Sequence, residues 1–214
     1  ELNLKLAAIE EEFATWPGNL VIAAKNANGP APLGIVAAGV CFSHLNDILA
    51  TIGLAGLLPI LKIATPYPLP RRLVAEFAQG CERLLVLEET DAAVEMQIRL
   101  GIPVWGRLSG HVPTHGGLIP AVIERLVAEA ASQAGLTARQ RPPNPLREAI
   151  AGLQLPIRRP TLCPGCGHRA VFYELRRAFP DALFPGDIGC YTLGFDQGAM
   201  DTVHDIGAQN TMPP

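Results

Sequence analysis

The strongest constraint on this fold is a regular alternation of apolar runs with helical patterns along the middle of the chain. The apolar runs are residues 33–40, 57–63, 84–87 and 103–106, and the helical patterns are residues 43–54, 71–79, 91–100 and 118–134. Strands that are apolar along their whole length, separated by helices of about ten residues, indicate a parallel sheet covered on both faces. With right-handed crossovers, the sequence predicts a doubly wound parallel sheet of the α/β class.

Composition divides the chain around this α/β domain, which takes residues 33–135. Residues 1–32 are a lead-in with a helix that ends before Trp16 and has one apolar face, made of Leu2, Leu6, Ile9 and Phe13. Residues 136–160 are rich in Pro and Arg, which predicts a linker with one short helix at 146–153. Residues 161–214 are too few for a domain of usual size, so we expect them to be the beginning of one.

The overall composition excludes several classes of protein. With 49% hydrophobic and 17% charged residues, the chain has enough apolar surface to fold. A net charge of −3 gives no reason to expect nucleic acid or an anionic membrane as partner. No apolar run reaches the ~18 residues of a membrane span. The odd count of five cysteines and the lack of a basic-then-apolar leader favour a reducing, cytoplasmic setting.

Polar residues follow two of the predicted strands, at the edge where open α/β sheets place ligands. The first strand lacks the glycine fingerprint of nucleotide-binding folds and is followed by Ser43 and His44, which we interpret as a helix cap and a half-buried histidine rather than as ligand contacts. Glu88 and Glu89 end the third strand, where carboxylates favourably precede a helix N-terminus. The pair His111 and His115 lies in a loop rich in Pro and Gly, which argues against a shared metal.

The most concentrated chemical signal lies in three of the five cysteines. Cys163 and Cys166 flank a Pro-Gly pair, and Cys190 follows 24 residues later between glycines. This pattern suits a soft metal or an iron–sulfur cluster, and its first half also suits a dithiol redox pair at a helix N-terminus. The fourth ligand would be His204 or a residue beyond 214, and plain structural thiols are the remaining alternative. Cys41 and Cys81 are expected to be ordinary buried thiols of the α/β domain.

Several motifs resemble one known family along the whole chain. Residues 163–169 (CPGCGHR), 186–194 (GDIGCYTLG) and 200–208 (MDTVHDIGA) resemble the start of the thiamine-diphosphate-binding domain of the indolepyruvate:ferredoxin oxidoreductase alpha subunit. Residues 61–70 (LKIATPYPLP), 85–89 (LVLEE) and 95–98 (EMQI) resemble the transketolase C-terminal-like domain of that subunit.

This resemblance implies an activity and a set of site residues. The implied reaction is oxidative decarboxylation of an aryl 2-oxoacid to an acyl-CoA, with electrons passed to ferredoxin. The cofactors would be thiamine diphosphate with Mg²⁺ and [4Fe-4S] clusters. The implied cluster ligands are Cys163, Cys166 and Cys190, and the implied cofactor-binding residues are Gly186, Asp187, Gly189, Cys190, Tyr191 and Thr192. The implied partners are a beta subunit and ferredoxin, and a homo-oligomer is compatible with the sequence.

Parts of that enzyme are expected to lie outside this sequence: the pyrimidine-binding domain before Glu1, and the magnesium–diphosphate segment and ferredoxin-like cysteine repeats after residue 214. No catalytic residue is therefore assigned, and we expect a fragment that is inactive alone and binds none of these cofactors by itself. The alternative is a non-catalytic α/β interaction module in which Cys163, Cys166, Cys190 and His204 hold a structural zinc ion.

Overall fold

The computed structural model describes residues 1–25, 29–141, 145–154 and 156–203. The chain divides into two compact units, residues 1–143 and 144–214. Among the described residues, no helix combines the length and apolarity needed to cross a membrane.

The first unit is built on a five-stranded sheet with the order β1-β3-β2-β4-β5. The strands are β1 (Leu20–Ile22), β2 (Gly34–Ala38), β3 (Ile60–Ile63), β4 (Leu84–Leu87) and β5 (Val104–Trp105). Strands β2 to β5 pair in parallel, and β1 is an antiparallel edge strand beside β3. The predicted α/β fold with a parallel sheet is therefore confirmed for β2 to β5. The antiparallel strand β1 was not predicted, because it has only three residues and two of them are exposed.

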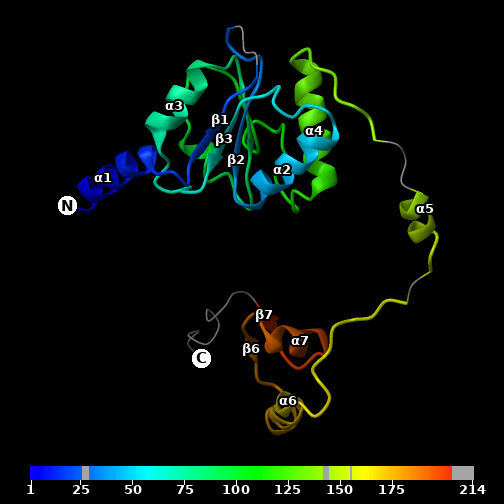
Figure 1. Ribbon diagram of the computed structural model, residues 1–214. Helices are drawn as coiled ribbons and strands as arrows, with labels where there is room; N and C mark the ends of the chain where they lie inside the picture. The colour runs from blue at the N-terminus through cyan, green and yellow to red at the C-terminus, as the bar shows by residue number, and fades with distance from the viewer. Residues whose placement is uncertain (26–28, 142–144, 155, 204–214) are drawn as a thin grey trace. The chain divides into compact units, whose positions relative to one another are not determined.

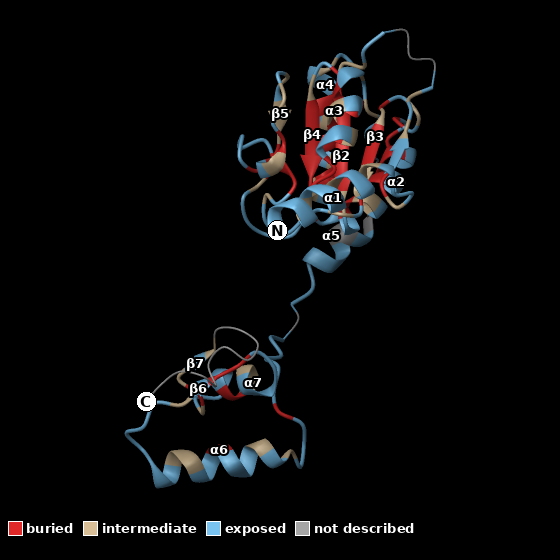
Figure 2. Ribbon diagram, turned by 90° about the vertical axis from the view of Figure 1, so that its left-hand side faces the viewer, coloured by how far each residue is buried: buried red, intermediate tan, exposed pale blue. Residues whose placement is uncertain are grey.

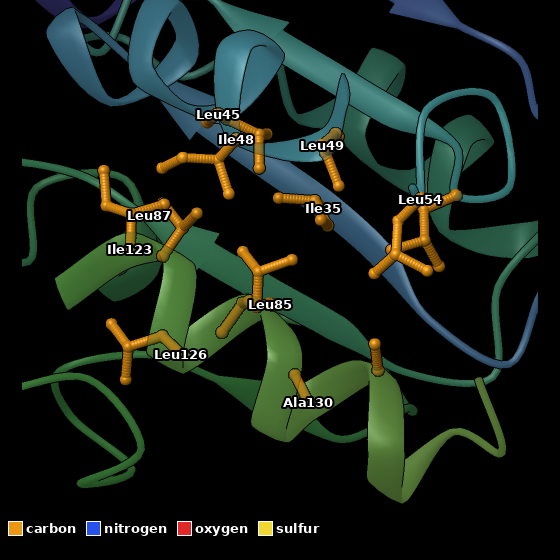
Figure 3. Packing of buried hydrophobic residues seen from close by; sticks show 14 of the residues in the cluster. Ile35, Leu45, Ile48, Leu49, Leu54, Leu85, Leu87, Ile123, Leu126 and Ala130 are labelled. Atoms are coloured by element: carbon orange, nitrogen blue, oxygen red, sulfur yellow. The ribbon is translucent and has the colours of Figure 1, made fainter. Parts of the chain in front are cut away.

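Helices cover both faces of this sheet (Figure 1). Helices α2 (Val40–Thr51) and α4 (Pro120–Gln133) lie on one face, and α3 (Arg71–Gln79) lies on the other. On the first face, Ile35 and Leu85 point between the apolar side chains of the two helices (Figure 3). On the second face, Val36 packs in the cluster that contains Phe77 of α3. Successive strand residues are thus buried on opposite faces, which explains the continuous apolar runs (Figure 2).

Two local predictions in this unit are wrong. Helix α2 begins at Val40 and not at Ser43, because Gly39 at the end of β2 takes a φ of +57° and turns the chain into the helix three residues earlier. The helix expected over residues 91–100 is only the short 3₁₀ turn η1 (Glu95–Gln97). Its preceding backbone N–H groups are held by the Glu88 side chain, which fixes the start of the turn.

The N-terminal helix α1 (Leu2–Thr15) contacts α3 mainly through charged side chains. The predicted apolar packing face is not buried, and Leu2 is 70% exposed. Instead, Glu10 pairs with Arg71 at 2.7 Å and Glu11 pairs with Arg72 at 3.1 Å. Glu10 and Glu11 therefore join α1 to α3.

The segment expected as a linker from residue 136 is partly attached to the first unit. Leu136 packs against the core between α2 and α4, and the Arg139 N–H donates to the Ile52 carbonyl at 2.8 Å. Arg141 forms an ion pair with Glu124 of α4 at 3.0 Å. Leu136 thus extends the core beyond the end of α4, and the two arginines add separate polar contacts.

The second unit is small and largely exposed (Figure 2). Its elements are α5 (Pro145–Ala151), α6 (Gly167–Ala178), β6 (Pro185–Gly186), α7 (Cys190–Asp196) and β7 (Thr202–Val203). Strands β6 and β7 pair in parallel, and the buried core consists of Leu162, Phe172 and Met200. Helix α6 directly follows Cys166, and of its apolar residues Phe172 is buried while Val171 is exposed, as is Phe179 at its end.

Candidate functional site

The Cys163–Cys166 segment forms a tight turn at the start of α6. The Cys166 N–H donates to the Cys163 carbonyl at 3.2 Å, and Gly165 has a φ of +71°. Pro at the second position and a glycine with positive φ at the third are the residues that a type II turn requires. The Pro-Gly pair therefore creates the turn that places Cys166 at the N-cap of α6, with its thiol half-buried and that of Cys163 exposed.

Two basic residues just inside α6 contact this turn. The His168 Nδ1 lies 3.3 Å from the Cys166 Sγ. Arg169 donates from Nε to the Cys163 carbonyl at 3.1 Å and from Nη2 to the Thr161 hydroxyl at 2.9 Å and to the Leu162 carbonyl. Arg169 thus ties the segment before the turn to the helix that follows it.

The second motif, residues 186–194, forms β6, a sharp turn and α7. Gly186 lies so close to its neighbours that a Cβ there would be 3.0 Å from the Tyr191 Cβ. Gly189 has a φ of +141°, and its N–H donates to the Thr192 hydroxyl at 3.1 Å. A Cβ on Gly194 would be 2.7 Å from the Phe172 ring. Each glycine of this motif therefore has a conformational or packing reason in the folded unit.

An aromatic cluster joins the two cysteine-bearing segments. The ring centroids of His168 and Phe172 are 5.6 Å apart, those of Phe172 and Tyr191 are 5.3 Å apart, and those of His168 and Tyr191 are 5.9 Å apart. His168 follows the Cys163–Cys166 turn, and Tyr191 follows Cys190. The fold thus packs the beginning of α7, which carries Cys190, against the beginning of α6.

The donor set of Cys163, Cys166 and Cys190 suits a soft metal or an iron–sulfur cluster, because all three thiols are free of disulfides and none is fully buried. However, the described part of the chain contains no group of three or more His, Cys, Asp or Glu side chains arranged to hold a metal ion. The turn can therefore supply two thiolate ligands to a metal or cluster. That Cys190 belongs to the same centre stays a prediction. His204, the other suggested ligand, lies outside the described residues.

The residues predicted to bind thiamine diphosphate form one continuous stretch of the second unit. They are Gly186, Asp187, Gly189, Cys190, Tyr191 and Thr192, in β6, the turn and the first residues of α7. Asp187 is the one carboxylate among them and is 9% exposed. A magnesium ion with a diphosphate requires further oxygen ligands, so the described residues supply at most part of that site.

In the first unit, the carboxylates at the end of β4 serve as caps, as expected. Glu88 accepts the N–H groups of Val94 at 2.6 Å and Glu95 at 2.9 Å, and Glu89 accepts the N–H of Leu118 just before α4. Burial raises the pKa of Glu88. Arg107, which directly follows Gly106 after β5, was missed at the sequence level although it is buried and donates to the Glu88 backbone carbonyl at 3.3 Å.

The other candidates of the first unit also have structural roles. His44 is half-buried, as expected, and His111 stacks on Trp105 with ring centroids 4.7 Å apart. Burial raises the pKa of Cys41 and of Cys81 to about 11, which agrees with ordinary buried thiols.

Comparisons with known proteins agree with the resemblance seen in the motifs. No protein-family model matches the chain. Among curated proteins, the indolepyruvate oxidoreductase subunit IorA of Methanothermobacter marburgensis is 40% identical over 97% of this chain and 34% of its own length. The corresponding subunit of Pyrococcus abyssi is 39% identical over 86% of this chain and 28% of its own length. The subunit of Thermococcus kodakarensis is 34% identical over 95% of this chain and 32% of its own length.

Among solved structures, the 2-oxoglutarate:ferredoxin oxidoreductase of Magnetococcus marinus is similar over 60% of this chain and 23% of its own, with 15% identity and a TM-score of 0.41. The chain spans about a third of the length of the curated relatives that it matches. Over nearly its whole length, this chain is therefore a relative of the indolepyruvate oxidoreductase IorA subunits and corresponds to about one third of such a subunit.

Proposed function

We propose that this chain is part of a thiamine-diphosphate-dependent 2-oxoacid:ferredoxin oxidoreductase of the indolepyruvate type. The observation that carries the proposal is the 40% identity with an IorA subunit along 97% of the chain. The enzyme would decarboxylate an aryl 2-oxoacid oxidatively to an acyl-CoA, together with a beta subunit and ferredoxin. The five free thiols agree with a reducing, cytoplasmic setting, which is part of the same proposal.

When bound, thiamine diphosphate supplies the carbanion stabilisation that 2-oxoacid decarboxylation needs, and a [4Fe-4S] cluster supplies acceptance of single electrons. In this proposal, Cys163 and Cys166 bind the cluster from the turn before α6, and Cys190 binds it from the start of α7. The residues from Gly186 to Thr192 line the cofactor beside it. The half-buried position of Cys166 would partly exclude water from the cluster.

The test of the cysteine assignment is anaerobic reconstitution, with iron and sulfide, of a complete subunit that contains this chain, because the chain alone is expected to bind no cofactor. We expect bound iron and sulfide, with absorption at roughly 400 nm, and we expect Cys163→Ser, Cys166→Ser and Cys190→Ser each to lower the bound iron. Cys81→Ala is the matched control, because this thiol is buried in the first unit. Iron binding that all three variants leave unchanged would contradict the assignment, and so would one tightly bound zinc ion per chain.

The test of the activity compares the purified chain with a complete indolepyruvate oxidoreductase, reconstituted from an IorA subunit and its beta subunit. Because the chain spans about a third of its relatives, we expect no 2-oxoacid-dependent dye reduction by the chain alone. Nothing in the comparisons favours the alternative of a non-catalytic zinc module. Saturable calorimetric binding of thiamine diphosphate with Mg²⁺ to the chain alone would show that the described residues hold more of the cofactor site than proposed.

A further inference from the structure

The contact between α6 and α7 rests on three rings whose positions are closely constrained. Phe172 is 3% exposed and forms the centre of the cluster, with His168 and Tyr191 beside it. Gly194 lets α7 approach the Phe172 ring, because any Cβ at this position would overlap that ring. The position of the Tyr191 ring is therefore set by the packing of α7 against Phe172 of α6.

Each outer ring is directly connected to one of the cysteines. His168 is two residues after Cys166, and its Nδ1 lies 3.3 Å from the Cys166 Sγ. Tyr191 is the residue after Cys190, and both belong to the first turn of α7. The contact between the His168 and Tyr191 rings, with centroids 5.9 Å apart and planes at 77°, thus directly connects the two cysteine segments.

We propose that His168 and Tyr191 are positioning residues, whose ring contacts on Phe172 set the Cys190 segment against the Cys163–Cys166 turn. The inference rests on the proposed function for its purpose, because a shared centre needs the three thiols near one another. Its geometry is independent of any bound metal. The arrangement explains why the motif CPGCGH continues to a histidine and why GDIGC continues to a tyrosine.

The expected effect of removing each ring follows from the number of ring contacts that it makes. Tyr191 contacts two other rings, so its removal eliminates both contacts on the side of α7. Removal of His168 eliminates two ring contacts and the contact with Cys166. The positioning depends on the Tyr191 ring and not on its phenol oxygen, so a phenylalanine should replace this residue without loss.

The experiment measures how readily Cys166 and Cys190 are bridged in the metal-free, reduced chain by a short bis-methanethiosulfonate reagent. A Cys163→Ser background leaves these two thiols as the accessible pair, because Cys41 and Cys81 are buried. Trypsin cleavage after Arg169 and Arg177 separates the two cysteines unless they are bridged, so mass spectrometry gives the bridged fraction. The matched control is Tyr173→Ala, a tyrosine of α6 that is 65% exposed and outside the cluster.

In Tyr191→Ala we expect the rate of bridging to fall about tenfold, which is the effect of losing one or two aromatic pairs. Tyr191→Phe and Tyr173→Ala should bridge at the rate of the parent. His168→Ala should also lower the rate, and His168→Phe should restore it because the ring remains. Parent-like bridging in both alanine variants would overturn the proposal.

A general loss of structure is distinguished from a loss of positioning by the ring-conserving variants. If Tyr191→Ala unfolds the second unit, Tyr191→Phe and His168→Phe still decide the question, since bridging lost in either folded variant contradicts the role of the rings. If bridging follows the prediction but the complete subunit binds no iron, the positioning role stands and the cluster assignment is refuted. Iron binding together with unchanged bridging in the alanine variants would support the cluster and refute the positioning role of the two rings.

Discussion

Gly194 is the residue at which the packing of the second unit leaves least space. Its missing Cβ lets Phe172 lie against α7, and a methyl group would be 2.7 Å from the ring. We therefore expect Gly194→Ala to destabilise the second unit by about 1–3 kcal/mol, the usual cost of overpacking a core. Hydrogen-exchange mass spectrometry of peptides from residues 156–203 gives this free energy without interference from the first unit.

The matched control for this substitution is Gly167→Ala at the start of α6. A Cβ on Gly167 meets nothing within 4 Å. Because alanine restricts the unfolded chain more than glycine, this variant should be unchanged or more stable by about 0.4–1 kcal/mol. Equal destabilisation by both substitutions would show that the close approach of Gly194 to Phe172 is not what limits the packing.

The pKa of Glu88 leads us to expect that the free energy of unfolding of the first unit depends on pH. Burial raises the pKa of this carboxyl in the folded state above its ordinary value of 4.5. A raised carboxyl pKa means that the folded state binds the proton more tightly, so the contribution of Glu88 to the free energy of unfolding is fully present at acid pH and is lost as the pH rises through the folded pKa.

The measurement compares the parent with Glu88→Gln in urea unfolding followed by the fluorescence of Trp16 and Trp105. Glutamine lacks the second acceptor oxygen, so one of the N–H groups of Val94 and Glu95 loses its partner and the variant is less stable by roughly 1–3 kcal/mol. The stability difference between parent and variant should shrink as the pH rises above 4.5. Glu82→Gln, at an exposed carboxylate, controls for surface charge, and a difference that grows with pH would contradict the direction given for Glu88.

At this scale the sequence predicted residues whose chemistry is local. The Pro-Gly pair between the cysteines and the cap role of Glu88 follow from turn and helix-terminus rules, and the structure has both. Arg107 and the packing of Gly194 on Phe172 could not be predicted in this way. Both depend on which distant segments the fold brings together, and a single sequence contains no record of that.

At the scale of elements, Arg176 is the connection between α6 and the β6–β7 pair. Its guanidinium donates to the Ala199 carbonyl at 3.0 Å and to the Ala182 carbonyl at 3.3 Å, and it forms an ion pair with Asp201 at 2.7 Å. The same group stacks on the Phe184 ring at 4.7 Å. Hydrogen bonds from Arg176 and the Phe184 N–H lower the pKa of Asp201.

We expect Arg176→Met to destabilise the second unit by roughly 1–3 kcal/mol, since two carbonyls and a carboxylate lose a charged donor while the apolar stem is kept. Amide exchange in β7 and in the residues before it should increase most. Arg177→Met tests the neighbouring exposed arginine of α6 and should change little. If the two variants exchange alike, the contacts of Arg176 do not hold α6 to the strands.

Helices were predicted correctly where apolar residues have a strong helical period and the sequence marks both ends of the helix. Helix α3 has the predicted bounds, because Pro70 and Gly80 limit an amphipathic run. The region from Asp91 to Leu100 has a helical spacing of apolar residues but forms only η1. Side chains engage its backbone, since Glu88 accepts the Val94 N–H at 2.6 Å and the Gln97 amide donates to the Ala93 carbonyl at 2.6 Å. Gln97 also accepts the Leu69 N–H at 3.0 Å, so side-chain hydrogen bonds override the local period.

At the scale of the whole molecule, the chain divides between residues 143 and 144, inside the predicted linker. Composition changes in this stretch, because Pro and Arg replace apolar residues there. It could not show that residues 136–141 still belong to the first unit, since Leu136 and Arg139 are held by contacts with α2, α4 and the residue that follows α2. These contacts change which bonds of the segment a protease should cut.

Limited trypsin digestion of the native chain tests this division. Arg158 is exposed and lies beside Ile157, which is 92% exposed, whereas the N–H of Arg139 is bonded to Ile52. Because proteolysis needs a backbone that can leave its contacts, we expect cleavage after Arg158 well before cleavage after Arg139. Mass spectrometry of the early products should therefore show a first-unit product that retains residues 136–141. The control is Leu136→Ser, which weakens the attachment of this segment to the core and should accelerate cleavage after Arg139 without changing the rate after Arg158. Simultaneous cleavage at both sites in the parent chain would mean that residues 136–141 are not held on the first unit.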